Sequence, residues 1–150
     1  MAGGGAVACP PVFRMRCVAK GRAVARLRLN GLTRMKVHVP RGESGALKRL
    51  GHIHMTVFDP DGRRVVGFLV KRPDVAGLVR RSDCFVALDA LEQRGDDLVV
   101  TDRRWGTGTA AQRRLGLDWD RCIMWIGMDA RTTKGKRLGL VSDAEVDRET

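Results

Sequence analysis

The sequence predicts an all-β fold: a small β-barrel, preceded by a disordered basic leader and followed by a second, incomplete β unit. Three observations support this expectation. Apolar runs are short and are separated by turns containing Gly, Pro and Asp. Residues 52–72 have the pattern of one complete β-hairpin, and a partial echo of that pattern occurs near the C-terminus. No apolar run approaches the roughly 18 residues of a membrane-spanning helix, so we expect no membrane insertion.

Charge is distributed unevenly along the 150 residues. The formal net charge is +11, and 43% of the residues are hydrophobic. Residues 1–50 hold 11 Lys and Arg against a single acid, Glu43. Residues 51–150 are close to neutral, so the high isoelectric point says little about the expected folded part.

Residues 1–46 are expected to form the basic leader, since they contain no acid before Glu43. Three interpretations remain open: a disordered basic segment, an organellar targeting segment, or a translation start placed upstream of a true start at Met35. The first and third are favoured. A secretory signal is disfavoured because the apolar stretch Ala6–Cys9 is short and precedes the basic residues.

The hairpin expected over residues 52–72 carries the strongest local signal. Alternation places two sets of side chains on opposite faces of the first strand: Ile53, Met55 and Val57 against His54, Thr56 and Phe58. The turn chemistry lies in Asp59-Pro60-Asp61-Gly62. The return strand is expected over Val65–Val70, around a central Gly67.

The first β unit is expected to extend over residues 47–101. Its further strands are predicted at Cys84–Leu88 and at residues 96–101. Residues 102–118 are predicted to be a linker because Gly106-Thr107-Gly108 is flexible in composition. Residues 119–150 are predicted to form the partial second unit, with strands at Cys122–Met128 and Arg137–Val141 around a turn.

Two copies of a short motif support a family resemblance. The pattern apolar-Asp-x-x-Gly, followed by apolar-Gly-x-apolar, is carried first by Asp59, Gly62 and Gly67. A variant with a longer turn is carried by Asp129, Gly135 and Gly139. This arrangement resembles the PRC-barrel family, as a tandem whose second copy is partial.

The resemblance implies a small β-barrel that serves as a docking surface rather than as a catalyst. It also implies that Gly67 and Gly139 permit strand curvature or close backbone approach. Neither a membrane helix nor a folded β domain is recognisable before the barrel, so more specialised roles in the family are not carried over. Residues 141–150 offer no return strand, and we hypothesise a C-terminal truncation of a longer tandem.

Chemical motifs are weak. His52 and His54 lie two apart on a strand, but no acid or Cys is near them in sequence, so exposed strand positions are favoured over a metal site. Cys9, Cys17, Cys84 and Cys122 are scattered, which favours reduced thiols and a cytoplasmic location. No catalytic pattern is recognisable among the carboxylates. We expect no enzyme, no cofactor, no metal and no small-molecule substrate.

Basic pairs are the remaining candidates for binding. A patch on the barrel rim that meets phosphates is one interpretation, and a solvated face balanced by acids is the other. The candidate patch comprises Arg63, Arg64, Lys71, Arg72, Arg80 and Arg81. The leading functional hypothesis is a non-enzymatic adaptor that binds a protein partner. The alternative is an RNA- or ribosome-associated assembly factor.

Overall fold

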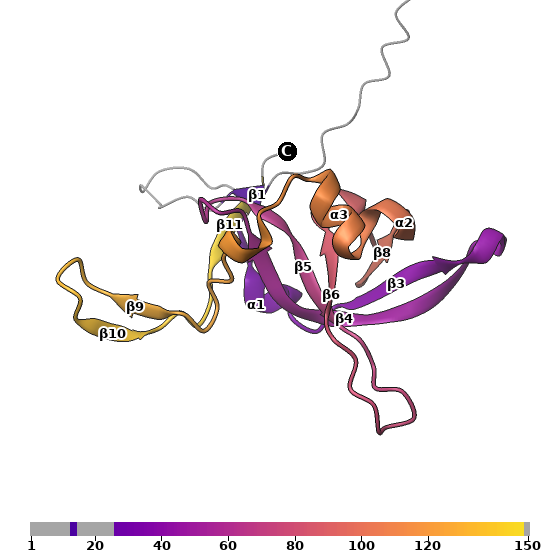
Figure 1. Cartoon of the computed structure of the whole chain (residues 1–150), viewed down its shortest axis with the longest axis horizontal. Coiled ribbons are helices and arrows are strands. Elements are labelled where there is room, and N and C mark those ends of the chain that lie inside the picture. The colour runs from indigo at the N-terminus through magenta and orange to yellow at the C-terminus, as the bar shows by residue number, and fades with distance from the viewer. Residues whose placement is uncertain (1–12, 15–25, 149–150) are drawn as a thin grey trace, which may run out of the picture.

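A curled, six-stranded β-sheet forms the body of the molecule (Figure 1). The computed structural model describes residues 13–14 and 26–148. The sheet has the order β6-β5-β4-β3-β8-β7, and only the β3–β8 pair is parallel. Its strands are β3 (Lys36–Arg41), β4 (Ala46–Phe58), β5 (Val65–Lys71), β6 (Cys84–Ala87), β7 (Leu91–Arg94) and β8 (Asp97–Val100). The fold is therefore mostly β, as expected.

The curl of the sheet follows from its connectivity. The two edge strands, β6 and β7, are joined only by the three-residue 3-10 helix η2 (Leu88–Ala90). Three residues span roughly 10 Å when extended, so the two edges must approach each other at this end. Bulges in β4 at Leu50 and His54, each an extra residue relative to its partner strand, help to bend the 13-residue strand.

The hairpin predicted over residues 52–72 is confirmed by the antiparallel β4–β5 pair. The predicted alternation of side chains is wrong beyond His54. A bulge there shifts the register by one residue, and the consecutive residues Thr56, Val57 and Phe58 are all buried, so buried and exposed positions no longer alternate. Phe58 lies at the end of β4, where it forms an antiparallel bridge with Ile123.

The leader expected over residues 1–46 is wrong for its second half. β3 lies in the sheet between β4 and β8, and its Val37 and Val39 are buried. Before it, α1 (Leu29–Leu32) buries Leu29 in the core, and the 3-10 helix η1 (Gly42–Ser44) closes the β3–β4 hairpin. Residues 1–12 and 15–25 lie outside the described residues, as do Cys9 and Cys17.

A second, smaller sheet joins the two ends of the described chain. It has the order β1 (Phe13–Arg14), β11 (Glu145–Arg148) and β2 (Arg26–Arg28), all antiparallel. Its Val146 is buried in the main core, and the backbone N–H of Leu29 donates to the carbonyl of Ala144 at 3.0 Å. The small sheet is thereby attached to the body.

The linker expected over residues 102–118 is also wrong. These residues contain α2 (Arg103–Gly106) and α3 (Gly108–Arg114), and α3 packs against β6 (Figure 1). The Asp102 carboxylate caps α2 by accepting a hydrogen bond from the N–H of Arg104 at 2.7 Å. Ala111 of α3 is fully buried, and its small side chain allows α3 to pack closely against the sheet. Among the described residues, no helix is both long and apolar enough to span a bilayer.

The strand predicted at Cys122–Met128 is wrong. After the 3-10 helix η3 (Trp119–Arg121), this segment forms a single bridge, between Ile123 and Phe58 at the end of β4. A separate two-stranded hairpin follows, made of β9 (Asp129–Arg131) and β10 (Arg137–Leu140). It projects from the body (Figure 1).

Candidate functional site

The turn between β4 and β5 is hydrogen-bonded to Trp125, in the segment between η3 and β9. One carboxylate oxygen of Asp59, Oδ1, accepts hydrogen bonds from the backbone N–H groups of Arg63 and Arg64, at 3.1 and 3.3 Å. The indole N–H of Trp125 donates to the carbonyl of Gly62 at 2.9 Å. Asp59 and Gly62 therefore shape a turn that Trp125 covers.

Gly67 lies in β5, in close contact with β6 and with the ring of Phe85. A Cβ atom on Gly67 would collide with the carbonyl oxygen of Val86 and would lie 2.7 Å from the ring of Phe85. Close backbone approach, which the motif implied for this glycine, is what the structure shows there. Phe85 in turn makes an edge-to-face contact with Trp119, with 5.4 Å between the ring centroids.

The second copy of the motif has a different geometry. Asp129 begins β9 and forms ion pairs with Arg131 at 3.1 Å and with Arg137 at 3.0 Å, instead of capping a turn. The N–H of Gly135 donates to the carbonyl of Thr132 at 2.8 Å within the turn. Gly139 lies opposite Ala130, beside a bulge in β10. The echo in the sequence is thus a second hairpin with its own turn.

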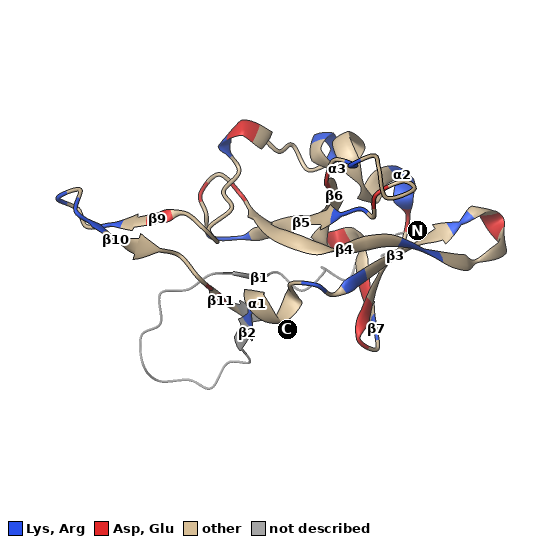
Figure 2. Ribbon diagram, turned by 90° about the horizontal axis from the view of Figure 1, so that it is seen from below, with Lys and Arg blue, Asp and Glu red and all other residues tan. Residues whose placement is uncertain are grey.

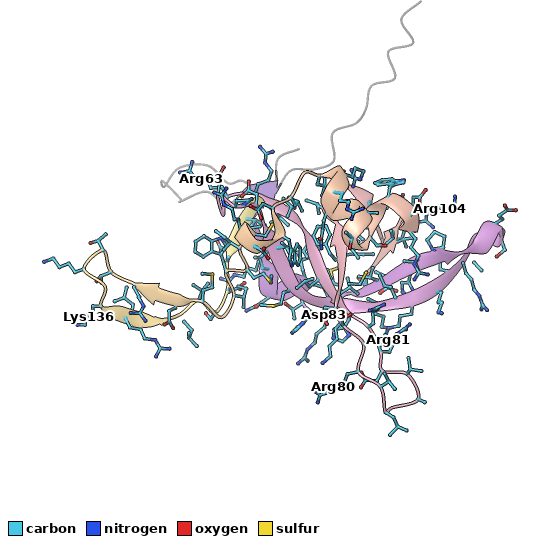
Figure 3. All side chains as sticks on the ribbon, viewed as in Figure 1. Arg63, Arg80, Arg81, Asp83, Arg104 and Lys136 are labelled. Atoms are coloured by element: carbon cyan, nitrogen blue, oxygen red, sulfur yellow. The ribbon has the colours of Figure 1, made fainter. Side chains whose placement is uncertain are left out.

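The six basic residues of the candidate patch lie in two places. Arg63 and Arg64 flank the β4–β5 turn, whereas Lys71 and Arg72 lie at the opposite end of the same hairpin. The length of β5 separates the two sets by roughly 20 Å. Arg80 and Arg81 belong to the loop after Arg72, far from Arg63 (Figure 3). The structure brings Lys71, Arg72, Arg80 and Arg81 towards one end and leaves Arg63 and Arg64 at the other.

An ion pair that the sequence did not suggest fixes α3 to η2. The guanidinium of Arg114 donates two hydrogen bonds to the carboxylate of Asp89, at 2.6 and 2.7 Å. It also lies 4.6 Å from the ring centroid of Trp105. The hydrogen bond to Asp89 raises the pKa of Arg114. The arrangement joins α3 to η2, the 3-10 helix between the two edge strands of the sheet.

His54 lies at the bulge in β4, and its Nδ1 is 2.6 Å from a carboxylate oxygen of Asp83. This pair joins the exposed face of β4 to the residue before β6. The described residues contain no group of three or more His, Cys, Asp and Glu side chains placed to hold a metal ion. Asp83 is the acidic partner of His54 that sequence proximity could not reveal.

Cys84 and Cys122 are free thiols, both partly buried. Burial raises the pKa of the Cys84 thiol, and nearby Arg72 opposes that rise. Burial also raises the pKa of the Cys122 thiol, with a further contribution from Asp118. Both thiols are accordingly held in the protonated form.

The hairpin formed by residues 128–141, called here the projecting hairpin, exposes apolar side chains. Leu138 is 68% exposed and Leu140 is 58% exposed. Lys134, Lys136 and Arg137 lie on the same hairpin, and Figure 2 shows its basic residues towards the tip. Exposed apolar side chains with polar residues around them are typical of surfaces that bind another molecule.

Comparisons with models of protein families, with curated proteins and with solved structures find no significant match to this chain.

Proposed function

We propose that this chain is a non-enzymatic adaptor that binds a protein partner through its projecting hairpin. The observation that carries the proposal is the exposure of Leu138 and Leu140 on a ribbon that extends away from the body. An isolated two-stranded hairpin is marginally stable in water, because it has no apolar face to bury. A partner that covers this ribbon would supply that face.

The energetics favour an apolar contact with a polar surround. Burial of one leucine side chain contributes about 1.5–3 kcal/mol to association. The ion pair of Asp129 with Arg137, at 3.0 Å, links the two strands of the hairpin. Lys134 and Lys136 favour a partner with acidic groups around an apolar contact.

We assign the β4–β5 unit to a PRC-barrel-like scaffold. Support comes from Asp59 and Gly62 in the turn and from the close approach at Gly67, the three positions of the first motif. The free thiols Cys84 and Cys122 favour a reducing compartment, and we place the protein in the cytoplasm. No step of catalysis is assigned to it.

RNA or ribosome binding is the second candidate function. It is favoured by the basic residues of the projecting hairpin. Residues 129–140 contain a single acid, Asp129. RNA affinity measured across a salt series tests it, because phosphate contacts release counterions. An affinity that falls steeply with salt would support this alternative, and absent or salt-independent binding would exclude it.

Site-specific photo-crosslinking tests the adaptor proposal. A photoreactive analogue of leucine replaces Leu138 in one variant, which keeps the apolar side chain there, and replaces Gln93 in a control variant. Gln93 is exposed as well, but it lies on the β7–β8 hairpin. In cells of the source organism, we expect a discrete crosslinked protein from position 138 and none from position 93. Equal crosslinking from both positions, or none from position 138, would contradict the proposal.

A further inference from the structure

The loop of residues 73–83 between β5 and β6 ends in an ordered apolar tip. Val75 and Val79 face each other, with N–H to carbonyl hydrogen bonds of 3.1 and 3.2 Å in both directions. Ala76 and Gly77 turn the chain with positive φ values of 52° and 69°. The tip is therefore a tight turn with a defined shape.

This tip exposes three aliphatic side chains. Leu78 is 89% exposed, more than any other large apolar residue described, and Val79 and Val75 are 61% and 49% exposed. The loop that carries them projects from the body (Figure 1), and their exposure makes its tip a convex apolar point. A convex point of this kind requires a soft apolar surface or a matching pocket to leave water.

Positive charge surrounds the base of the loop. Lys71, Arg72, Arg80 and Arg81 lie within or beside it, and Figure 3 shows Arg80 on the projecting part and Arg81 nearer the body. Of the two acids in the same stretch, Asp74 precedes the tip and Asp83 lies 2.6 Å from Nδ1 of His54, so the four basic residues are in excess. The loop thus has an apolar tip with a basic collar.

We propose that the 73–83 loop inserts its tip into the surface of an anionic lipid bilayer. Aliphatic side chains enter the boundary between headgroups and acyl chains, while Lys and Arg remain among anionic headgroups. Val75, Leu78 and Val79 supply the first part, and the basic collar supplies the second. A bilayer accepts a convex tip of any outline, whereas a protein partner would need a pocket that matches it.

Vesicle co-sedimentation of the full chain tests the proposal. The vesicles contain either phosphatidylcholine alone or equal parts of phosphatidylcholine and phosphatidylglycerol. The test variant is Leu78→Ser, and the matched control is Leu47→Ser, which removes an exposed leucine from β4, outside both the loop and the projecting hairpin. Serine is neutral, so neither variant alters the charge. A third variant, Arg80→Glu with Arg81→Glu, tests the collar.

We expect binding to the anionic vesicles only. Leu78→Ser should lower the partition coefficient about tenfold or more, since a buried leucine side chain is lost. Leu47→Ser should bind as the wild type does, and the charge-reversal variant should bind more weakly and with less dependence on salt. Thermal melts of each variant verify that the fold is intact.

Two results would overturn the inference. One is the absence of wild-type binding to anionic vesicles. The other is binding that Leu78→Ser leaves unchanged, because the 11 Lys and Arg of residues 1–50 would then account for it. The adaptor proposal rests on Leu138 and is unaffected by either result.

Discussion

Trp125 donates its indole N–H to the carbonyl oxygen of Gly62, although the two residues are 63 positions apart. Gly62 closes the most local element of the fold, the β4–β5 turn. Trp125 belongs to the segment between η3 and β9. The turn therefore depends on a segment that the sequence pattern had assigned to a separate unit.

Substitution of Gly62 by Ala should destabilise the fold for two reasons. Gly62 has a φ of +68°, which costs a non-glycine residue about 1–2 kcal/mol. The new Cβ would also lie 2.7 Å from Cζ2 of Trp125, and such overpacking costs about 1–3 kcal/mol more. Urea unfolding measures the sum.

Gly95→Ala is the matched control for that experiment. Gly95 has a φ of +61° in the β7–β8 turn, and apart from its chain neighbours no heavy atom lies within 4 Å of the place that a Cβ would occupy. It should show the backbone cost alone. Equal losses in the two variants would mean that Trp125 does not press on the turn.

Gly67→Ala should be more damaging, because the obstacle is backbone. The added Cβ would meet the carbonyl oxygen of Val86, which cannot move without breaking the β5–β6 pairing. We expect a loss of about 3 kcal/mol or more in the free energy of unfolding. Gly31→Ala, in the open at α1, should change it little, and a mild effect at Gly67 would argue against the close approach.

Elements whose partners are close in the sequence were predicted, and elements whose partners are distant were not. The β4–β5 hairpin was predicted because its strands and its turn are contiguous. β3 was missed, although Val37 and Val39 alternate with polar residues, because the basic bias of residues 1–50 concealed that short pattern. β3 lies between β4 and β8, and its pairing with β8 is parallel. No local sequence signal specifies a parallel pairing.

The roles of the candidate site residues were also predictable only where their contacts are close in the sequence. Asp59 and Gly62 act in their own turn, so the residues themselves indicated their role. The pairing of Asp89 with Arg114 joins η2 to α3, and the composition of residues 106–111 suggested a linker there. The bulge at His54 could not be predicted from alternation, since a bulge breaks the pattern that alternation reads.

A double-mutant cycle on Arg114 and Asp89 should reveal coupling. The two side chains are about one third exposed and are joined by two short hydrogen bonds, so we expect about 0.5–1 kcal/mol of interaction. The comparison pair is Arg94 with Glu92, which is more than half exposed and should couple by less than about 0.3 kcal/mol. Similar values for both pairs would show that the α3 contact is not special.

Cys84 should alkylate slowly in the folded protein. Its raised pKa leaves a smaller thiolate fraction at any given pH, so the half-maximal rate should occur at higher pH than in urea. Because the folded state holds this proton more tightly, the free energy of unfolding should fall as the pH rises from the unfolded-state pKa through the folded-state pKa. Iodoacetamide labelling, quantified peptide by peptide, measures the rate. A folded rate equal to that in urea would contradict the burial.

The adaptor proposal is tested most directly by titrating the protein that crosslinks to position 138 with two purified forms of this chain. One form is the wild type, and the other carries Leu138→Ser and Leu140→Ser. We predict that the double variant raises Kd by about a hundredfold, since two buried leucines are lost, while Leu78→Ser leaves Kd unchanged. Equal affinities for the wild type and the double variant would contradict the account.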